Sequence, residues 1–246
     1  MKKIRLFCLP YAGGSSMVYS KWKDNLDKSI LLHPLELAGR GKRINEPNYN
    51  TAEEAADDVL AMIRFQLADL PYAFYGHSLG ALIAYLTAQK IREMKYPGPA
   101  HIFFSGRGAP HIHRDDKPLY YTLPEDEFRE KVLALGGTPP EFFAIPELLE
   151  ILLPLLRGDF KISGTYRLHG DIKPLDCDIT VLTGKEEDLL PEQIEEWKLH
   201  TKKQCTLYSF EGGHFFLNNP LEKEKIIHII NDTLGKVARM RIPRYV

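Results

Sequence analysis

A serine between two glycines, in the stretch "YGHSLGALIAY", is the residue of this chain best placed to act as a nucleophile. Ser78 follows the strand-like run "YAFYG" and precedes a helical pattern, so the chain must turn sharply here. Gly76 and Gly80 suit such a turn, because glycine has no side chain to obstruct a close backbone approach. A strand, a turn and a helix in this order are typical of a nucleophile elbow. We predict that Ser78 attacks a carbonyl carbon.

A serine hydroxyl needs a base that takes its proton, and the base needs an acid that fixes its tautomer. The best base is His214 in "SFEGGHFFLNNP", which follows a strand-like run and two glycines. The loop after "ITVLTG" offers three carboxylates in succession, Glu186, Glu187 and Asp188. The resulting chain order of serine, acid and histidine is that of the α/β-hydrolase triad.

Acyl transfer also requires two N–H donors for the negative oxygen of the tetrahedral intermediate. One donor in an elbow of this kind is the amide of the residue after the nucleophile, here Leu79. The other comes from an early loop, and we assign it to "LPYAGGSS", from Leu9 to Ser16. Within it we choose the amide of Ala12, with Tyr11 as the second choice.

The elements that must position these residues alternate between short apolar runs and helical patterns, as in a parallel sheet covered by helices. Expected strands are "IRLFCL", "ILLHPLEL", "YAFYG", "AHIFFSG", "ITVLTG" and "CTLYSF". The pattern breaks over residues 111–170, which read as helical and proline-rich. We therefore expect one α/β domain over 1–246, with a mostly parallel central sheet flanked by helices and a helical insertion at 111–170.

Composition excludes several other classes of protein. The 246 residues carry a net charge of -1, whereas nucleic-acid binding usually needs a clustered basic excess. The three cysteines form no C-x-x-C pair, which argues against a disulfide framework or a zinc site. His111 and His113 have ligand-like spacing but no third ligand near them in sequence. We expect no metal and no other cofactor, no membrane span, and a cytoplasmic protein.

Eight blocks of the sequence together resemble the type II (external) thioesterases of nonribosomal peptide and polyketide synthesis. They are "LPYAGG", "ELAGRGKR", "YGHSLGA", "SGRGAPHI", "LGGTP", "LLPLLRGDF", "EEDLLPEQIEEW" and "FEGGHFFL", and they cover nearly the whole chain. The resemblance implies an α/β-hydrolase that removes acyl groups from the phosphopantetheine arm of acyl or peptidyl carrier proteins. It supports Ser78 and His214 as catalytic residues.

The acid departs from the family pattern. The family usually has an aspartate three positions after the glycine that ends the strand, and this chain has Glu187 there, with Asp188 one step further. Either the longer glutamate reaches the histidine from the usual place, or the loop is rearranged so that Asp188 faces it. We prefer Asp188, because shorter carboxylates dominate this role.

The resemblance also implies that the insertion at 111–170 is a lid whose apolar residues shape an acyl channel. Our candidates for its walls are Phe142, Phe143, Leu149 and Leu153. Two alternatives stay open: a medium-chain acyl-carrier-protein thioesterase or general esterase on the same fold, and a non-catalytic binding protein that retains the fold. We expect a monomer that acts without a cofactor, its substrate being carried on phosphopantetheine.

Overall fold

The computed structural model describes residues 3–239, except 115, 117, 138–141 and 143–144. Its centre is a sheet of six strands in the order β2-β1-β3-β4-β5-β6, and every neighbouring pair is parallel. The prediction of a mostly parallel sheet flanked by helices is therefore confirmed. The strands are β1 (Ile4–Leu9), β2 (Ile30–Pro34), β3 (Tyr72–His77), β4 (His101–Ser105), β5 (Asp178–Gly184) and β6 (Cys205–Phe210).

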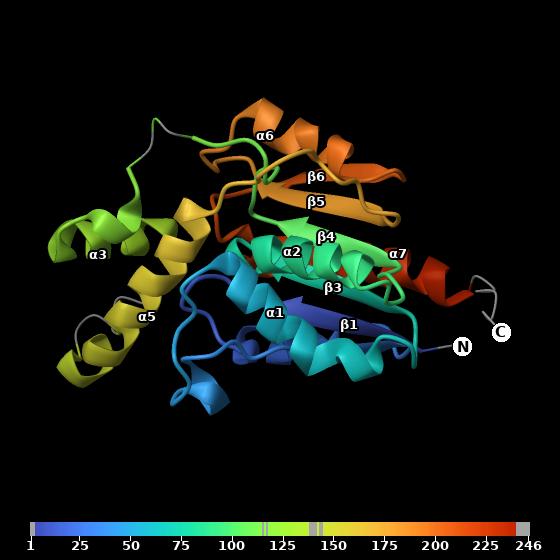
Figure 1. The fold of residues 1–246 in the computed structure, drawn as a ribbon, viewed down its shortest axis with the longest axis horizontal. Coiled ribbons are helices and arrows are strands. Elements are labelled where there is room, and N and C mark those ends of the chain that lie inside the picture. Colours follow the sequence, from blue (N-terminus) through green and yellow to red (C-terminus); the bar gives the residue numbers. More distant parts are fainter. Residues whose placement is uncertain (1–2, 115, 117, 138–141, 143–144, 240–246) are drawn as a thin grey trace.

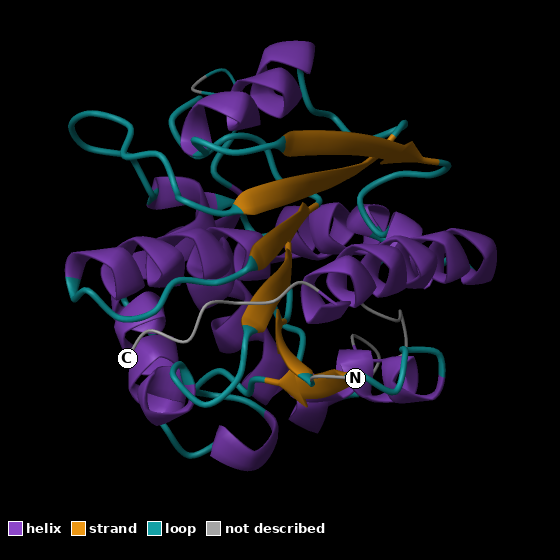
Figure 2. Cartoon of the chain, turned by 90° about the vertical axis from the view of Figure 1, so that its right-hand side faces the viewer, coloured by secondary structure: helices purple, strands orange, loops and turns teal. Residues whose placement is uncertain are grey.

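Helices cover both faces of this sheet, which Figure 2 shows from the side. The two layers explain why the inner strands are apolar on both faces rather than alternating. One layer contains α1 (Ala52–Ile63) and α2 (Leu79–Glu93), and the other contains α7 (Pro220–Arg239). The shorter helices are η1 (Ser16–Asp24), η2 (Gly41–Arg43), η3 (Arg64–Gln66), α6 (Pro191–Glu195), η5 (Glu196–His200) and η6 (Phe216–Asn218).

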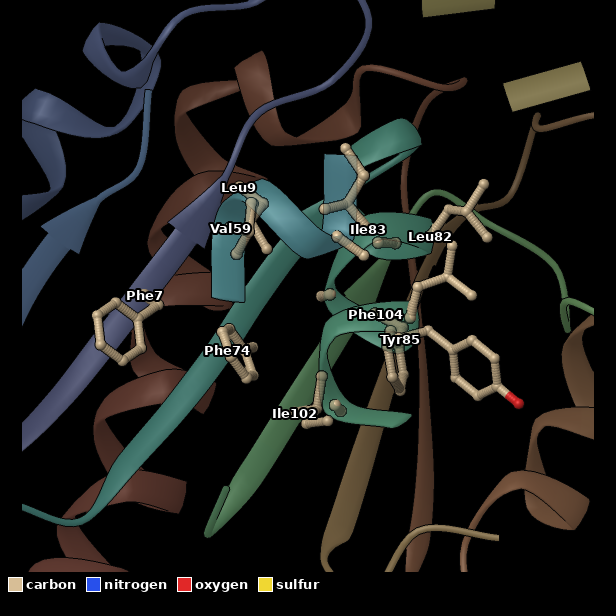
Figure 3. Packing of buried hydrophobic residues seen from close by; sticks show 14 of the residues in the cluster. Phe7, Leu9, Val59, Phe74, Leu82, Ile83, Tyr85, Ile102 and Phe104 are labelled. Carbon is tan, nitrogen blue, oxygen red and sulfur yellow. The ribbon is translucent and has the colours of Figure 1, made fainter. Parts of the chain in front are cut away.

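The hydrophobic core is accordingly divided between the two faces. Phe74 of β3 and Phe104 of β4 pack with α1 and α2, and Figure 3 shows this layer from close by. Their chain neighbours Tyr75 and Phe103 point to the opposite face and pack with α7. All four side chains are fully buried. Neighbouring residues of one strand thus fill different halves of the core, as the period of two requires.

The residues between β4 and β5 form η4 (Tyr120–Thr122), α3 (Glu125–Leu135) and α5 (Pro146–Thr165). We call residues 111–170 the inserted segment. Figure 1 shows α3 and α5 beyond the carboxyl ends of the strands, away from α1 and α7. The segment has a small apolar cluster of its own, centred on Phe128, Val132 and Leu156.

Helix α5 runs through Pro154 without ending there. A proline inside a helix leaves one carbonyl without its N–H partner and costs about 3 kcal/mol. The helix continues because its apolar side is buried beyond the proline, at Leu155, Leu156 and Ile162. Among the described residues, no helix is long and apolar enough to cross a membrane.

Candidate active site

Ser78 occupies the strained position of the turn between β3 and α2. Its φ of 56° and ψ of -113° are rare for a residue with a side chain, and its N–H donates to the Ser105 carbonyl at 2.7 Å. The flanking glycines are needed for close approach, because a Cβ on Gly76 would lie 2.2 Å from the Gly80 oxygen. A Cβ on Gly80 would lie equally close to the Leu9 oxygen. Strain of this kind, held by the surrounding backbone, is typical of functional sites.

His214 lies beside Ser78, although 136 positions separate the two residues in sequence. The Ser78 hydroxyl donates to Nε2 of His214 across 2.9 Å, and Nδ1 of His214 donates to Oε1 of Glu187 across 2.6 Å. The second carboxylate oxygen, Oε2, accepts the N–H of Gly184 at 2.8 Å. Glu187 is almost completely buried, with 3% of its side chain exposed. A serine, an imidazole and a buried carboxylate therefore form one continuous chain of hydrogen bonds.

The carboxylate beside the histidine is that of Glu187, our alternative acid, and not that of Asp188, which we preferred. The side chain of Asp188 is 76% exposed and lies 3.6 Å from the Arg114 guanidinium, in the inserted segment. Consecutive residues of this turn point in different directions, and only Glu187 points back to the end of β5. Its extra methylene lets it reach both its own turn and His214. Glu186, the third carboxylate of the run, contributes its amide, which donates to the Gly212 carbonyl at 3.0 Å.

Two glycine positions bring the loop after β5 against the loop of His214. A Cβ on Gly184 would lie 2.4 Å from the Gly213 oxygen, so the two backbones meet directly. Gly212 has a φ of +102°, which residues with a side chain rarely adopt. The pair "GG" before the histidine thus serves the approach of the two loops.

The two expected oxyanion donors flank Ser78. Leu79 is the first residue of α2, where helical N–H groups have no acceptor inside the helix. Ala12 lines the same cavity as Ser78 and His214. Among the described residues, no acceptor is hydrogen bonded to either amide. Tyr11, our second choice, also lines the cavity, with its ring 4.7 Å from that of Phe215.

A cavity of about 30 Å³ opens above the serine. Its far wall comes from the inserted segment, which contributes Val132 and Leu135 of α3 and Leu156 and Phe160 of α5. The remaining lining residues belong to the loops at the sheet edge: Tyr11, Ala12, Ser78, His214 and Phe215, with Gly137 after α3. The wall is mainly apolar and suits the acyl part of a substrate.

Three of our four candidates for the channel wall, Phe142, Leu149 and Leu153, are not among the residues that line this cavity. Leu149 and Leu153 lie on the face of α5 that carries Leu156 and Phe160, but one to three turns nearer its start. Phe142 is 41% exposed, and Phe143 lies outside the described residues. The helical spacing of residues 149, 153, 156 and 160 identifies the face of α5 that turns toward the cavity. Which part of that face reaches the cavity depends on how α5 packs on the core, which the spacing does not reveal.

A second serine–histidine pair lies behind the first, and its surroundings do not suit catalysis. Nδ1 of His77 lies 2.9 Å from the Ser105 hydroxyl, which also accepts from the Tyr75 hydroxyl at 3.1 Å. Both His77 and Ser105 are fully buried, and neither lines the cavity. Burial holds the pKa of His77 well below its ordinary value, so the ring stays neutral. His77 bonds locally to Ser105, and this pair supports the turn from within.

Histidines elsewhere make no metal site in the described part of the chain, where no three suitable ligands come together. Nδ1 of His111 lies 2.7 Å from Nε2 of His200, and Nδ1 of His200 lies 3.0 Å from the Tyr85 hydroxyl. Burial lowers the pKa of His200 to about 3. This chain of hydrogen bonds joins the start of the inserted segment to η5.

Comparison with known proteins agrees with this geometry. Residues 4–234 match the thioesterase domain family. The chain is 37% identical to the gramicidin S biosynthesis protein GrsT of Aneurinibacillus migulanus, over 87% of this chain and 83% of the relative. Two solved structures superpose closely. ClbQ of the colibactin NRPS/PKS pathway has a TM-score of 0.88 and 31% sequence identity, over 96% of this chain and 98% of ClbQ. The type II thioesterase BorB of the borrelidin biosynthetic cluster has a TM-score of 0.84 and 30% sequence identity, over 94% of this chain and 93% of BorB.

Family, fold and hydrogen-bonded serine are consistent with one another. The chain therefore belongs to the thioesterase domain family: it is a serine thioesterase of the α/β-hydrolase fold, and its relatives include type II thioesterases of nonribosomal peptide and polyketide pathways as well as medium-chain S-acyl fatty acid synthase thioesterases.

Proposed function

We propose that Ser78 is the nucleophile, His214 the general base and Glu187 the acid that orients it. The observation that supports this most strongly is the unbroken series of hydrogen bonds from Ser78 through His214 to the buried Glu187, which opens into an apolar cavity. Glu187 keeps the proton of His214 on Nδ1, so that Nε2 can accept the proton of serine. Asp188, which points to solvent, takes no part.

The reaction proceeds in two halves through an acyl-serine. Ser78 Oγ attacks the thioester carbonyl while His214 takes its proton, and the negative oxygen accepts hydrogen bonds from the amides of Leu79 and Ala12. The carbon–sulfur bond then breaks, and His214 returns the proton to the departing thiol. A water molecule, activated by the same histidine, hydrolyses the acyl-serine and restores the free hydroxyl.

The enzyme acts as an editing type II thioesterase that removes acyl or aminoacyl groups from the phosphopantetheine arm of carrier proteins. The thiol of that arm is the leaving group, and the inserted segment is a lid within a single domain over 1–246. The cavity holds only about 30 Å³ and is closed by bulky apolar side chains of the inserted segment, which favours short acyl groups. The cofactor-like arm belongs to the substrate and not to this chain.

The test compares acyl chains and carriers on the purified protein. We expect propionyl-pantetheinyl carrier protein to be hydrolysed faster than both decanoyl-pantetheinyl carrier protein and free p-nitrophenyl esters. A fluorophosphonate should label the wild type and not Ser78→Ala. A preference for the decanoyl carrier would instead assign the chain to medium-chain thioesterases, and a folded wild type that resists labelling would contradict catalysis by Ser78.

We further propose that the protein is a cytoplasmic monomer that binds carriers transiently. Its cysteines are free thiols: Cys8 and Cys177 are buried and Cys205 is half-buried. A reducing compartment suits such thiols. Size-exclusion chromatography with light scattering tests the monomer, and a dimer at micromolar concentration would contradict it.

A further inference from the structure

A buried ion pair joins the inserted segment to the loop that carries Ala12. Arg40 donates to both carboxylate oxygens of Asp159 in α5, at 2.7 and 2.9 Å. Only 3% of the Arg40 side chain and 4% of the Asp159 side chain are exposed. The same carboxylate accepts a third hydrogen bond, at 2.7 Å, from the amide of Gly13. A charged residue of the inserted segment therefore binds the loop after β1.

The amide that Asp159 binds is the central peptide of a tight turn. Gly14 donates to the Tyr11 carbonyl at 2.9 Å, and Gly13 has a φ of +74° while Ala12 keeps an ordinary negative φ. These features define a type II turn, with glycine at its third position. In a type I turn the central peptide is flipped, so the Ala12 carbonyl oxygen would face the carboxylate. Asp159 thus favours the type II form by attraction and opposes the flipped form by repulsion.

Stability alone does not account for this pair. Burying an ion pair costs so much hydration free energy that apolar residues of similar volume often stabilise a fold equally well or better. Arg40 also donates to the carbonyls of Ala38 and Gly14, at 3.2 and 3.3 Å. The guanidinium therefore holds both the carboxylate and the carbonyl at the end of the turn. The arrangement specifies the conformation of one loop.

We propose that Asp159 is a positioning residue of the oxyanion hole: through the Gly13 amide it holds the turn that presents the Ala12 N–H to the substrate. This rests on the function proposed above. Docking of α5 then completes the catalytic site, because the segment that closes the acyl cavity also supplies the carboxylate that shapes the donor loop. Leu156 lies against the same turn, since a Cβ on Gly13 would come within 2.4 Å of its Cδ2.

Another contact between α5 and the core provides a matched control. Arg107, at the end of β4, donates to the hydroxyl of Ser163 at 2.9 Å and to its carbonyl at 3.2 Å. Ser163→Ala removes a tie between the same helix and the core without touching the Tyr11–Gly14 turn. A role of Asp159 in anchoring the lid predicts similar kinetics for both variants. A role in positioning the donor predicts a difference.

The first experiment measures hydrolysis of a butyryl thioester of N-acetylcysteamine. We expect Asp159→Ala to lower kcat about 10- to 100-fold with KM within about threefold of wild type, as weakening one oxyanion donor does. The inhibition constant of a butyl trifluoromethyl ketone, which forms an oxyanion on serine, should rise by the same factor. Ser163→Ala should change neither quantity more than about threefold. Equal kcat for the two variants would overturn the proposal.

Two double variants separate the hydrogen bond from the ion pair, and they also serve if Asp159→Ala fails to fold. Arg40→Met with Asp159→Asn removes both charges but keeps an oxygen for the Gly13 amide. Arg40→Met with Asp159→Leu removes the charges and the acceptor. We expect the asparagine variant to retain kcat within about fivefold of wild type and the leucine variant to lose about 10-fold or more. Equal kcat and equal ketone inhibition in the two would refute a positioning role.

A parallel measurement on Ser78→Ala distinguishes the two levels of the argument. If Ser78→Ala hydrolyses the thioester like wild type, the proposed function fails, and the positioning role of Asp159 fails with it. If Ser78→Ala is inactive and the two double variants remain alike, only the positioning role of Asp159 fails.

Discussion

Replacing Glu187 by glutamine tests the acid that the structure selects. Glu187 uses both oxygens, Oε2 for the Gly184 amide and Oε1 for Nδ1 of His214. A glutamine has only one oxygen. If that oxygen stays with Gly184, its NH₂ group faces His214 and donates to Nδ1. The imidazole proton then moves to Nε2, where the ring can no longer accept the proton of Ser78.

The magnitude follows from the alternative orientation of the amide. Turning the amide so that its oxygen faces His214 leaves the buried Gly184 N–H against an NH₂ group, at a cost of about 1–3 kcal/mol. The productive orientation is then populated roughly one time in 10 to 100, and the neutral amide also stabilises the imidazolium less than a carboxylate does. We expect kcat for a short acyl thioester to fall by about 10²- to 10⁴-fold, with KM little changed.

Asp188→Asn is the matched control, because it makes the same chemical change one position away on a side chain that is 76% exposed. It should keep kcat within about threefold of wild type. Glu187→Asp should be intermediate, since the shorter chain cannot reach both Gly184 and His214. If Asp188→Asn loses as much activity as Glu187→Gln, the assignment of the acid is wrong.

Three further changes address the turn, the cavity and the buried histidines. Gly80→Ala should abolish activity or folding, because its Cβ would lie 2.2 Å from the Leu9 oxygen, and soluble, fully active protein would refute this. Leu156→Ala, at a side chain only 1% exposed, should lower the free energy of unfolding by about 2–5 kcal/mol. It should also raise the rate of hydrolysis of octanoyl carriers relative to propionyl carriers, and an unchanged ratio of these two rates would contradict the place of Leu156 in the cavity wall. The pKa of His200 is about 3, so the unfolded chain binds more protons than the folded chain between pH 3 and 6.5, and the free energy of unfolding rises with pH in this range. In His200→Gln, urea unfolding should show a slope of this free energy against pH that is smaller by up to about 1.4 kcal/mol per pH unit. A slope identical to that of wild type would refute this.

The placement of Ser78 and His214 beside each other could be expected from the sequence because both follow strands of a parallel sheet. The carboxyl ends of such strands meet at one edge, so two loops distant in the chain come together there. The strand patterns of β3 and β6 are enough for this argument. It predicts which loops meet and leaves open which atom of each loop makes the contact.

The acid shows where that argument stops. Glu187 and Asp188 are adjacent, and strand ends locate the loop only to within a residue or two. What selects Glu187 is the return of its side chain to the Gly184 amide, a contact inside a turn whose conformation no periodicity records. The preference for a shorter carboxylate was a rule about side-chain type, and the local backbone overrode it.

The inserted segment links the recognition of substrate to the chemistry. Its apolar residues, Leu156 and Phe160, form the far wall of the cavity, and Asp159 between them binds the turn that carries Ala12. On one turn of a helix, therefore, two residues four positions apart face the cavity, while the carboxylate between them faces the loop of Ala12. Any movement of α5 that admits a carrier arm must also loosen the hydrogen bond to Gly13. On the proposed role of Asp159, we expect the oxyanion hole to be complete only when the helix is seated over the cavity.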